Sequence, residues 1–290
     1  MMKKKWSLLL FVLVALAMSC TDRETEEGPV DKTANLRGTG DSANDILSNT
    51  RYDKLEVEIA YVTNFRPTNQ AMREFREFLQ QHTFKEDIQM KFTELPSPDE
   101  EELTIERVAE LESQNRTAYT RGSTLAVYIY FADAPAEGDE MDEGLVTLGA
   151  VYRNTSMIIH AETIRRLAAT TSLISRGDVE GATLNHEFGH LFGLVNLGSP
   201  PVNPEHEDTE APNHCNVAGC LMRAELQFGV STGKTKAVHD LRAYTAGFEP
   251  GCVISGNNVL QLLGSKTGKG AIAPGLGEEC LLDLEANGGR

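Results

Sequence analysis

The feature that most constrains this chain is the pattern H-E-x-x-H, formed by His186, Glu187 and His190. In a helix, residues four apart lie on one face, so both imidazoles would point the same way. Two neutral imidazoles at this separation can bind one zinc ion, and Glu187, about 100° around the helix, can reach a water beside it. In such sites the metal lowers the pKa of that water toward about 7, and the carboxylate accepts its proton. The pattern therefore predicts a Zn²⁺ site with Glu187 as the general base.

The residues around the pattern favour a helix that ends soon after the second histidine. Leu184, Phe188, Leu191 and Leu194 fall at helical spacing and form an apolar face. Gly193 follows the second histidine by three residues, where a helix can end in a left-handed turn. This context favours a metal site over the alternative, a core helix with two hydrogen-bonded histidines.

The longer pattern H-E-x-x-H-x-x-G resembles the metzincin clan of zinc endopeptidases, in which a third ligand follows three residues after the glycine. Here that position is Asn196, a poor zinc ligand. Residues 214–222 read H-C-x4-C-x-M and are similar to the segment that follows the glycine turn in archaemetzincins. The resemblance implies that His214 is the third ligand, that Met222 forms the methionine turn, and that residues 196–213 are an insertion. A group of surface lipoproteins of Bacteroidetes described as zinc-dependent metalloproteases has the same pattern.

The third zinc ligand has a rival inside the insertion, His206, with Asn196 and Asp208 as further candidates. His214 is favoured because it lies eight residues before Met222, as in the archaemetzincin pattern. Any of these choices leaves a fourth coordination position open for water, as catalytic zinc requires.

The N-terminus predicts export and a lipid anchor. Three lysines precede an apolar stretch that is too short to span a membrane, and Cys20 follows a small residue. This resembles a bacterial lipoprotein signal, which implies a signal peptide over residues 1–19 and lipidation of Cys20. Residues 20–50 are polar and acidic and predict a flexible tether. We therefore expect an exported bacterial lipoprotein of the outer membrane, on the periplasmic face or the cell surface.

Charge and cysteine content narrow the class further. Residues 20–290 carry 24 basic and 43 acidic residues, a formal charge of −19, which excludes nucleic acid as a partner. Apart from Cys20 the chain has four cysteines, and an even number in an exported chain predicts two disulfides, with Cys215–Cys220 and Cys252–Cys280 as the preferred pairing. Archaemetzincins use cysteines, including a downstream C-x-x-C, for a structural zinc, but this chain has no C-x-x-C. The sequence thus favours disulfides over a second zinc.

Hydrophobic periodicity predicts one α+β domain over residues 51–290. Strands are expected at 55–63, 86–94, 123–131, 145–152 and 155–160, and helices at 68–81, 97–116, 161–175, 178–193 and 234–246. This order resembles the metzincin fold: a mixed twisted sheet with an active-site helix, an N-terminal subdomain to about residue 194 and a small C-terminal subdomain over 195–290. The resemblance also implies that residues 145–152 form a sheet edge where an extended substrate binds.

The sequence therefore predicts a monomeric zinc endopeptidase that acts on peptides or proteins. Two alternatives stay open at this stage. One is a catalytically inactive binding or adhesion lipoprotein on a protease fold, and the other is a zinc hydrolase of non-peptide substrates.

Overall fold

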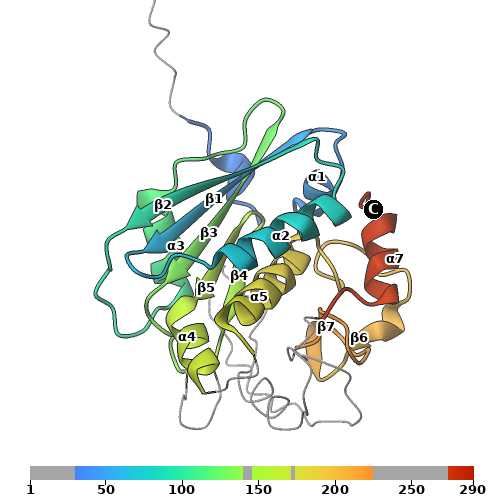
Figure 1. Cartoon of the computed structure of the whole chain (residues 1–290). Coiled ribbons are helices and arrows are strands. Elements are labelled where there is room, and N and C mark those ends of the chain that lie inside the picture. The colour runs from blue at the N-terminus through green and yellow to red at the C-terminus, as the bar shows by residue number, and fades with distance from the viewer. Residues whose placement is uncertain (1–29, 140–145, 171–173, 225–273) are drawn as a thin grey trace, which may run out of the picture. The chain divides into compact units, whose positions relative to one another are not determined.

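A computed structural model describes residues 30–139, 146–170, 174–224 and 274–290 (Figure 1). The chain divides into two compact units, Met1–Val30 and Asp31–Arg290, and the fold below is that of the second. The predicted signal peptide, Cys20, Cys252 and the predicted helix at 234–246 lie outside the described residues. None of the described helices combines the length and apolar character needed to cross a membrane.

The centre of the domain is a five-stranded mixed sheet, which confirms the predicted fold class. Its strand order is β2-β1-β3-β5-β4, with β4 antiparallel to β5 and all other pairs parallel. The strands are β1 (Lys54–Val62), β2 (Asp87–Leu95), β3 (Thr124–Ala132), β4 (Gly149–Arg153) and β5 (Ser156–His160). All five match predicted strands, although β4 begins four residues later than periodicity indicated. As expected, β4 lies at a sheet edge.

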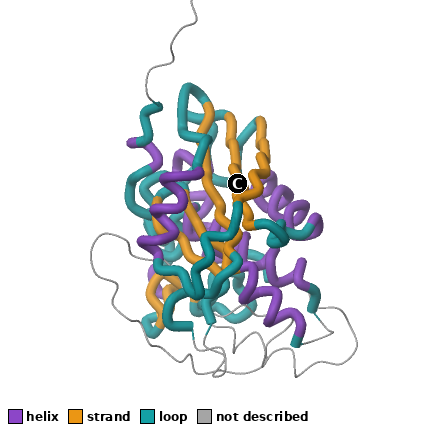
Figure 2. The backbone as a smooth tube through the Cα atoms, turned by 90° about the vertical axis from the view of Figure 1, so that its left-hand side faces the viewer, coloured by secondary structure: helices purple, strands orange, loops and turns teal. Residues whose placement is uncertain are grey.

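Helices cover both faces of this sheet (Figure 2). One face carries α2 (Asn69–His82), α4 (Ala161–Ala169) and α5 (Arg176–Leu191), and the other carries α3 (Ile105–Asn115). The rings of Phe75 in α2 and Phe188 in α5 meet edge to face with centroids 5.1 Å apart. The start predicted for α3 was too early, because the hydroxyl of Thr104 caps the helix by accepting from the Arg107 backbone N–H.

Residues 33–50, predicted to belong to a flexible tether, are packed against the domain. They contain the 3₁₀ helix η1 (Thr33–Asn35) and α1 (Ala43–Leu47), and Ile46 and Leu47 are fully buried. The Asn35 amide donates to the carbonyl of Ala126 at 2.9 Å, so this segment is bonded to β3. The prediction missed this because the anchor is one specific side chain, which leaves no periodic pattern.

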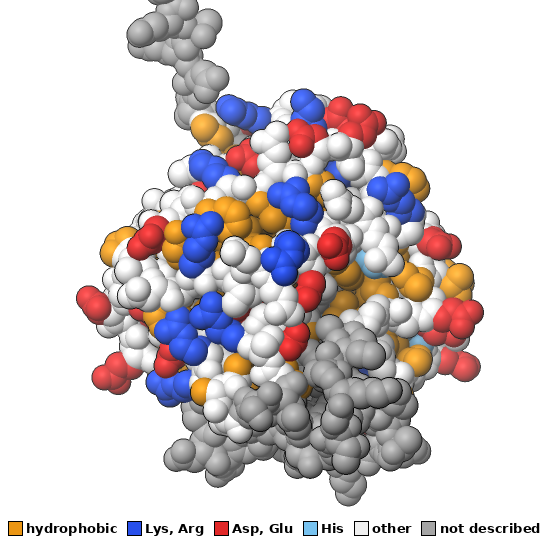
Figure 3. Space-filling model, viewed as in Figure 1, with side chains coloured by type: hydrophobic (Ala, Val, Ile, Leu, Met, Phe, Trp, Pro, Cys, Tyr) orange, Lys and Arg blue, Asp and Glu red, His pale blue; other side chains and the backbone are white. Residues whose placement is uncertain are grey.

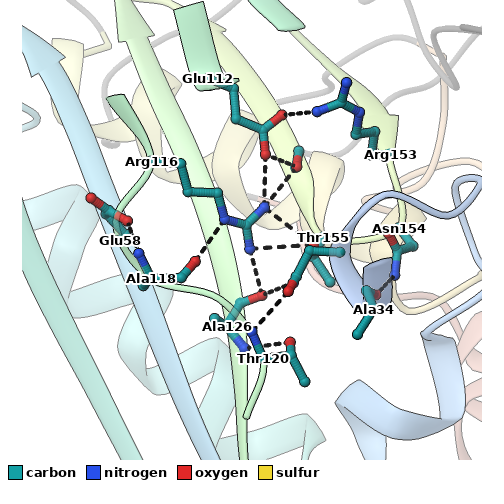
Figure 4. A network of polar contacts seen from close by, with 12 residues as sticks. Ala34, Glu58, Glu112, Arg116, Ala118, Thr120, Ala126, Arg153, Asn154 and Thr155 are labelled. Atoms are coloured by element: carbon teal, nitrogen blue, oxygen red, sulfur yellow. Dashed lines mark hydrogen bonds and ion pairs between the residues drawn. The ribbon is translucent and has the colours of Figure 1, made fainter. Parts of the chain in front are cut away.

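A buried polar network joins α3 to β4 and β5 (Figure 4). The guanidinium of Arg116 pairs with Glu112 at 2.7 Å and donates to the carbonyls of Ala118 and Ala126. The second carboxylate oxygen of Glu112 pairs with Arg153 of β4 at 2.8 Å. The buried charges are thus paired and hydrogen-bonded, which is the condition under which burial is tolerated.

The C-terminal part contains η2 (Pro204–His206), the antiparallel pair β6 (Glu207–Asp208) and β7 (Ala211–Cys215), and α7 (Glu278–Ala286). Helix α7 was not predicted, because no sustained periodicity marks the tail. On the face that Figure 3 shows, Lys and Arg side chains occur in separate groups among apolar and acidic side chains.

Candidate metal centres

Helix α5 carries the H-E-x-x-H pattern and is fixed at both ends. Ser175 is the N-cap, so the helix begins two residues before the predicted start at 178. Asp178 completes a capping box by accepting from the Ser175 backbone N–H. At the other end, Gly193 has a φ of 75°, and the Leu194 N–H donates to the Gly189 carbonyl at 3.2 Å. This confirms the predicted glycine turn, which redirects the chain directly after the second histidine.

The structure brings His186 and His190 of α5 together with His214 of β7. Their three ligand nitrogens all lie within 4.8 Å of one another, and all three side chains are buried. The two Nε2 atoms of the α5 histidines are 3.1 Å apart. In a tetrahedral zinc site with Zn–N bonds of about 2.0–2.1 Å, neighbouring nitrogens are separated by about 3.3 Å. The residues therefore fit a zinc ion.

Hydrogen bonds orient two of the three imidazoles for this role. Nδ1 of His186 is 2.7 Å from the carbonyl of Leu221, and Nδ1 of His214 is 3.0 Å from the carbonyl of Pro212. A carbonyl only accepts, so Nδ1 is the donor and Nε2 carries the lone pair in the neutral ring. This is the tautomer in which Nε2 binds a metal, with the backbone carbonyl holding the ring in place.

Burial also keeps the two histidines of α5 neutral. Burial, together with the neighbouring His214, lowers the pKa of His186 to about 3. Burial likewise places the pKa of His190 well below its ordinary value, aided by the other two imidazoles. Protons therefore do not compete with a metal for these nitrogens near neutral pH, since neutral imidazole is the ligand form.

Glu187 is fully buried and lies against the edge strand β4. A Cβ atom placed on Gly149, the first residue of β4, would stand 2.9 Å from Cγ of Glu187 and 3.1 Å from Cγ2 of Thr183. A glycine is thus required for this close approach. The side chain of Glu187 therefore lies where α5 packs against the edge strand β4.

Met222, which the resemblance assigns to a methionine turn, packs against Gly189 of α5. It is fully buried, and its Sδ atom occupies the space that a side chain on Gly189 would need. Its carbonyl accepts from the Cys215 N–H at 2.8 Å, which joins residues 220–222 to β7.

The rival third ligands lie elsewhere. The amide of Asn196 is 3.5 Å from Glu207, and Asp208 accepts from the Glu210 N–H at 3.0 Å. His206 joins a different cluster, described next. Of the four candidates, His214 alone is grouped with the two histidines of α5.

The cysteines correct the predicted disulfides. Cys215, Cys220 and Cys280 are free and buried, so neither the Cys215–Cys220 bridge nor a bonded Cys280 is present. The Sγ atoms of Cys220 and Cys280 are 3.6 Å apart, and one ligand atom each of His206, Cys215 and Cys280 lies within 4.8 Å of the others. The disulfide prediction was wrong because it considered only bonds between cysteines and favoured the short loop from Cys215 to Cys220.

This Cys-His cluster, made of His206, Cys215, Cys220 and Cys280, also fits a metal. Adjacent sulfurs in a tetrahedral zinc site with Zn–S bonds of about 2.3 Å are separated by about 3.8 Å, close to the observed 3.6 Å. Nε2 of His206 bonds to Asp283 at 2.8 Å, and its buried Nδ1 has no hydrogen-bond partner among the described residues. A cysteine set with one histidine is a donor set of structural zinc.

Thiol–thiol contacts produce opposing pKa shifts within the cluster. Hydrogen bonds from Cys215 and Cys280 lower the pKa of Cys220, because they stabilise its thiolate. The same hydrogen bonds with Cys220 raise the pKa of Cys215 and of Cys280, which keep their protons as donors. One thiol of the three therefore ionises ahead of the others, as the first thiolate ligand of a metal would.

No protein-family model matches the chain, and no curated protein matches it. A crystal structure of archaemetzincin from Methanopyrus kandleri is similar, with a TM-score of 0.44 and 15% sequence identity over 82% of this chain and 97% of that one. This similarity is too low to assign a function, so the assignment rests on the residues of the site.

Proposed function

We propose that the protein is a zinc-dependent endopeptidase in which His186, His190 and His214 bind the metal and Glu187 is the catalytic base. The observation that carries the proposal is the convergence of these three buried imidazoles within 4.8 Å, with Glu187 next to the first of them on α5. Three histidines leave one position open on a tetrahedral metal, which distinguishes a catalytic site from a closed structural one.

The chemistry follows from this arrangement. When bound, zinc would polarise the substrate carbonyl and acidify the attacking water. Glu187 would accept the proton of that water and later donate it to the nitrogen of the leaving amine. The Leu221 and Pro212 carbonyls hold two imidazoles in the ligand tautomer during this cycle, and Met222 packs against Gly189, between the two histidines in the sequence of α5.

The edge strand β4 is the proposed substrate-binding element. Among the described residues its only strand partner is β5, so its other edge faces away from the sheet. An extended peptide could add to that edge by backbone hydrogen bonds. Because Gly149 of β4 lies against Glu187, a peptide bound there would pass beside the catalytic base.

We also propose a second zinc in the Cys-His cluster, with a structural role. Four protein ligands would close the coordination shell and leave no position for a substrate. The lipid anchor at Cys20 and the location in the outer membrane remain proposals based on the N-terminal sequence.

The proposed activity can be tested with an unfolded protein substrate and a peptide library. We expect the purified protein to cleave internal peptide bonds, a chelator to abolish cleavage, and added Zn²⁺ to restore it. A zinc-loaded protein that cleaves esters or other non-peptide substrates but no peptide would replace the proposal by a different hydrolase. A zinc-loaded protein without any turnover would indicate a binding protein on this fold.

A further inference from the structure

The two candidate metal centres share one wall, made of β7 and residues 220–222. His214 and Cys215 are neighbours on β7, and successive residues of a strand point to opposite faces. His214 accordingly joins the histidine cluster and Cys215 joins the Cys-His cluster.

Residues 220–222 also have contacts with both clusters. Cys220 contacts Cys280 in the Cys-His cluster, while the carbonyl of Leu221 accepts from His186 in the histidine cluster. Met222 bonds to Cys215 through its backbone and packs against Gly189 through its side chain. Each segment of the wall therefore contributes to both centres.

The wall is attached to the rest of the domain by α7. Cys280 and Asp283 lie one turn apart on this helix, and both are fully buried. Asp283 accepts from the Val202 N–H at 2.6 Å through one oxygen and bonds to Nε2 of His206 at 2.8 Å through the other. A carboxylate on one ring nitrogen orients a histidine so that its other nitrogen can bind a metal.

Helix α7 is in turn bonded to α1 and, through Ser199, to the end of α5. The side chain of Asn287 donates to Ser199, whose hydroxyl donates to the Phe192 carbonyl at the end of α5. The Asn44 amide donates to the Asn287 carbonyl at 2.8 Å. The Cys-His cluster thus joins the β6–β7 hairpin to a helix that is bonded to α1 and to the end of α5.

We infer that the Cys-His centre is a positioning device for the catalytic centre: metal held by His206, Cys215, Cys220 and Cys280 fixes β7 so that His214 can act as the third catalytic ligand. Asp283 is a positioning residue in this scheme, because it orients His206. The inference rests on the proposed function, since it assigns a metal to the three histidines. It makes the metal affinity of one centre depend on occupation of the other, a coupling that must be reciprocal.

The test is a titration of the metal-free full chain with Co²⁺ and with Zn²⁺. Co²⁺ bound by thiolates gives an intense sulfur-to-metal absorption that a three-histidine site lacks, so the two centres are distinguished by spectrum. Zinc affinities are measured by competition with a chromophoric chelator. His190→Ala removes a ligand of the histidine centre and should retain the thiolate absorption. The binding step that is lost in this variant therefore belongs to the histidine centre.

We expect the parent to bind two metal ions per chain and to show the thiolate absorption. Cys280→Ser should lose that absorption and one ion, and zinc affinity at the histidine centre should fall roughly 10- to 100-fold, as for loss of a supporting group around a metal ligand. Asp283→Asn should shift both affinities in the same direction by a smaller factor. Glu285→Gln, an exposed substitution on the same helix, should change neither.

Two results would overturn the inference. One is a parent without thiolate absorption, and the other is unchanged histidine-centre affinity in a Cys280→Ser variant that has lost the absorption. If Cys280→Ser does not fold, as judged by circular dichroism, Asp283→Asn decides the question. Weaker metal binding at the Cys-His centre of this variant with unchanged histidine-centre affinity would then overturn the inference. If the parent shows the thiolate absorption but binds no more metal than His190→Ala does, the histidine centre holds no metal, and the proposed catalytic zinc site is wrong.

Discussion

Replacing Glu187 by glutamine is expected to lower peptide hydrolysis roughly 10²- to 10⁴-fold, the contribution typical of a positioned general acid–base. Glutamine has nearly the same shape but cannot accept a proton from the attacking water. Zinc content should not change, because Glu187 does not belong to either metal-ligand cluster. The measurement is kcat/KM on a peptide substrate, together with metal analysis of the same preparation.

The matched control is Glu210→Gln, which makes the same chemical change at an exposed position of the insertion. It should retain parental activity and zinc content. A Glu187→Gln variant with full peptidase activity and bound zinc would show that another group supplies the base, and the proposed mechanism would be wrong.

Replacing Arg116 by methionine is expected to destabilise the domain by about 3–5 kcal/mol, the usual cost of removing one partner from a buried ion pair. The side chain of Arg116 is fully buried, and that of Glu112 is 2% exposed. Methionine fills part of the space but leaves the Ala118 and Ala126 carbonyls without their guanidinium donor. Urea unfolding at neutral pH gives the change in the free energy of unfolding.

Arg107→Met provides the comparison for this substitution. Arg107 pairs with Glu100 and Glu110 on the surface of α3, where solvent weakens the interaction, so the expected loss of stability is much smaller than for Arg116→Met. A similar loss for both variants would mean that the network of Figure 4 contributes no more than surface pairs do.

The regular elements could be predicted because burial imposes a period on the sequence. Leu55, Val57 and Ile59 alternate toward one face of β1, and Met72, Phe75 and Leu79 recur along α2. The packed segment over residues 33–50 could not be predicted in this way. Its attachment depends on contacts such as Asn35 with Ala126, far apart in the chain, and such contacts leave no local pattern.

The metal centres also differ in whether their residues are close together or far apart in the chain. His186 and His190 are local partners on one helix, so their convergence follows from spacing alone. The Cys-His cluster combines the insertion, β7 and α7, and its members are up to 74 residues apart, from His206 to Cys280. The usable signal was that Cys280 and Asp283 stand one helical turn apart in a short segment with acidic residues at its start.

The most direct test of the catalytic zinc site is the zinc content of the purified protein, measured by mass spectrometry for the parent, His214→Ala and His82→Gln. His82 lies outside both clusters, so its replacement serves as the control. The proposed function predicts two zinc ions per chain in the parent and in His82→Gln, and loss of the histidine-centre zinc in His214→Ala. A parent that binds no zinc when it is supplied, or a His214→Ala variant with undiminished zinc content, would contradict it.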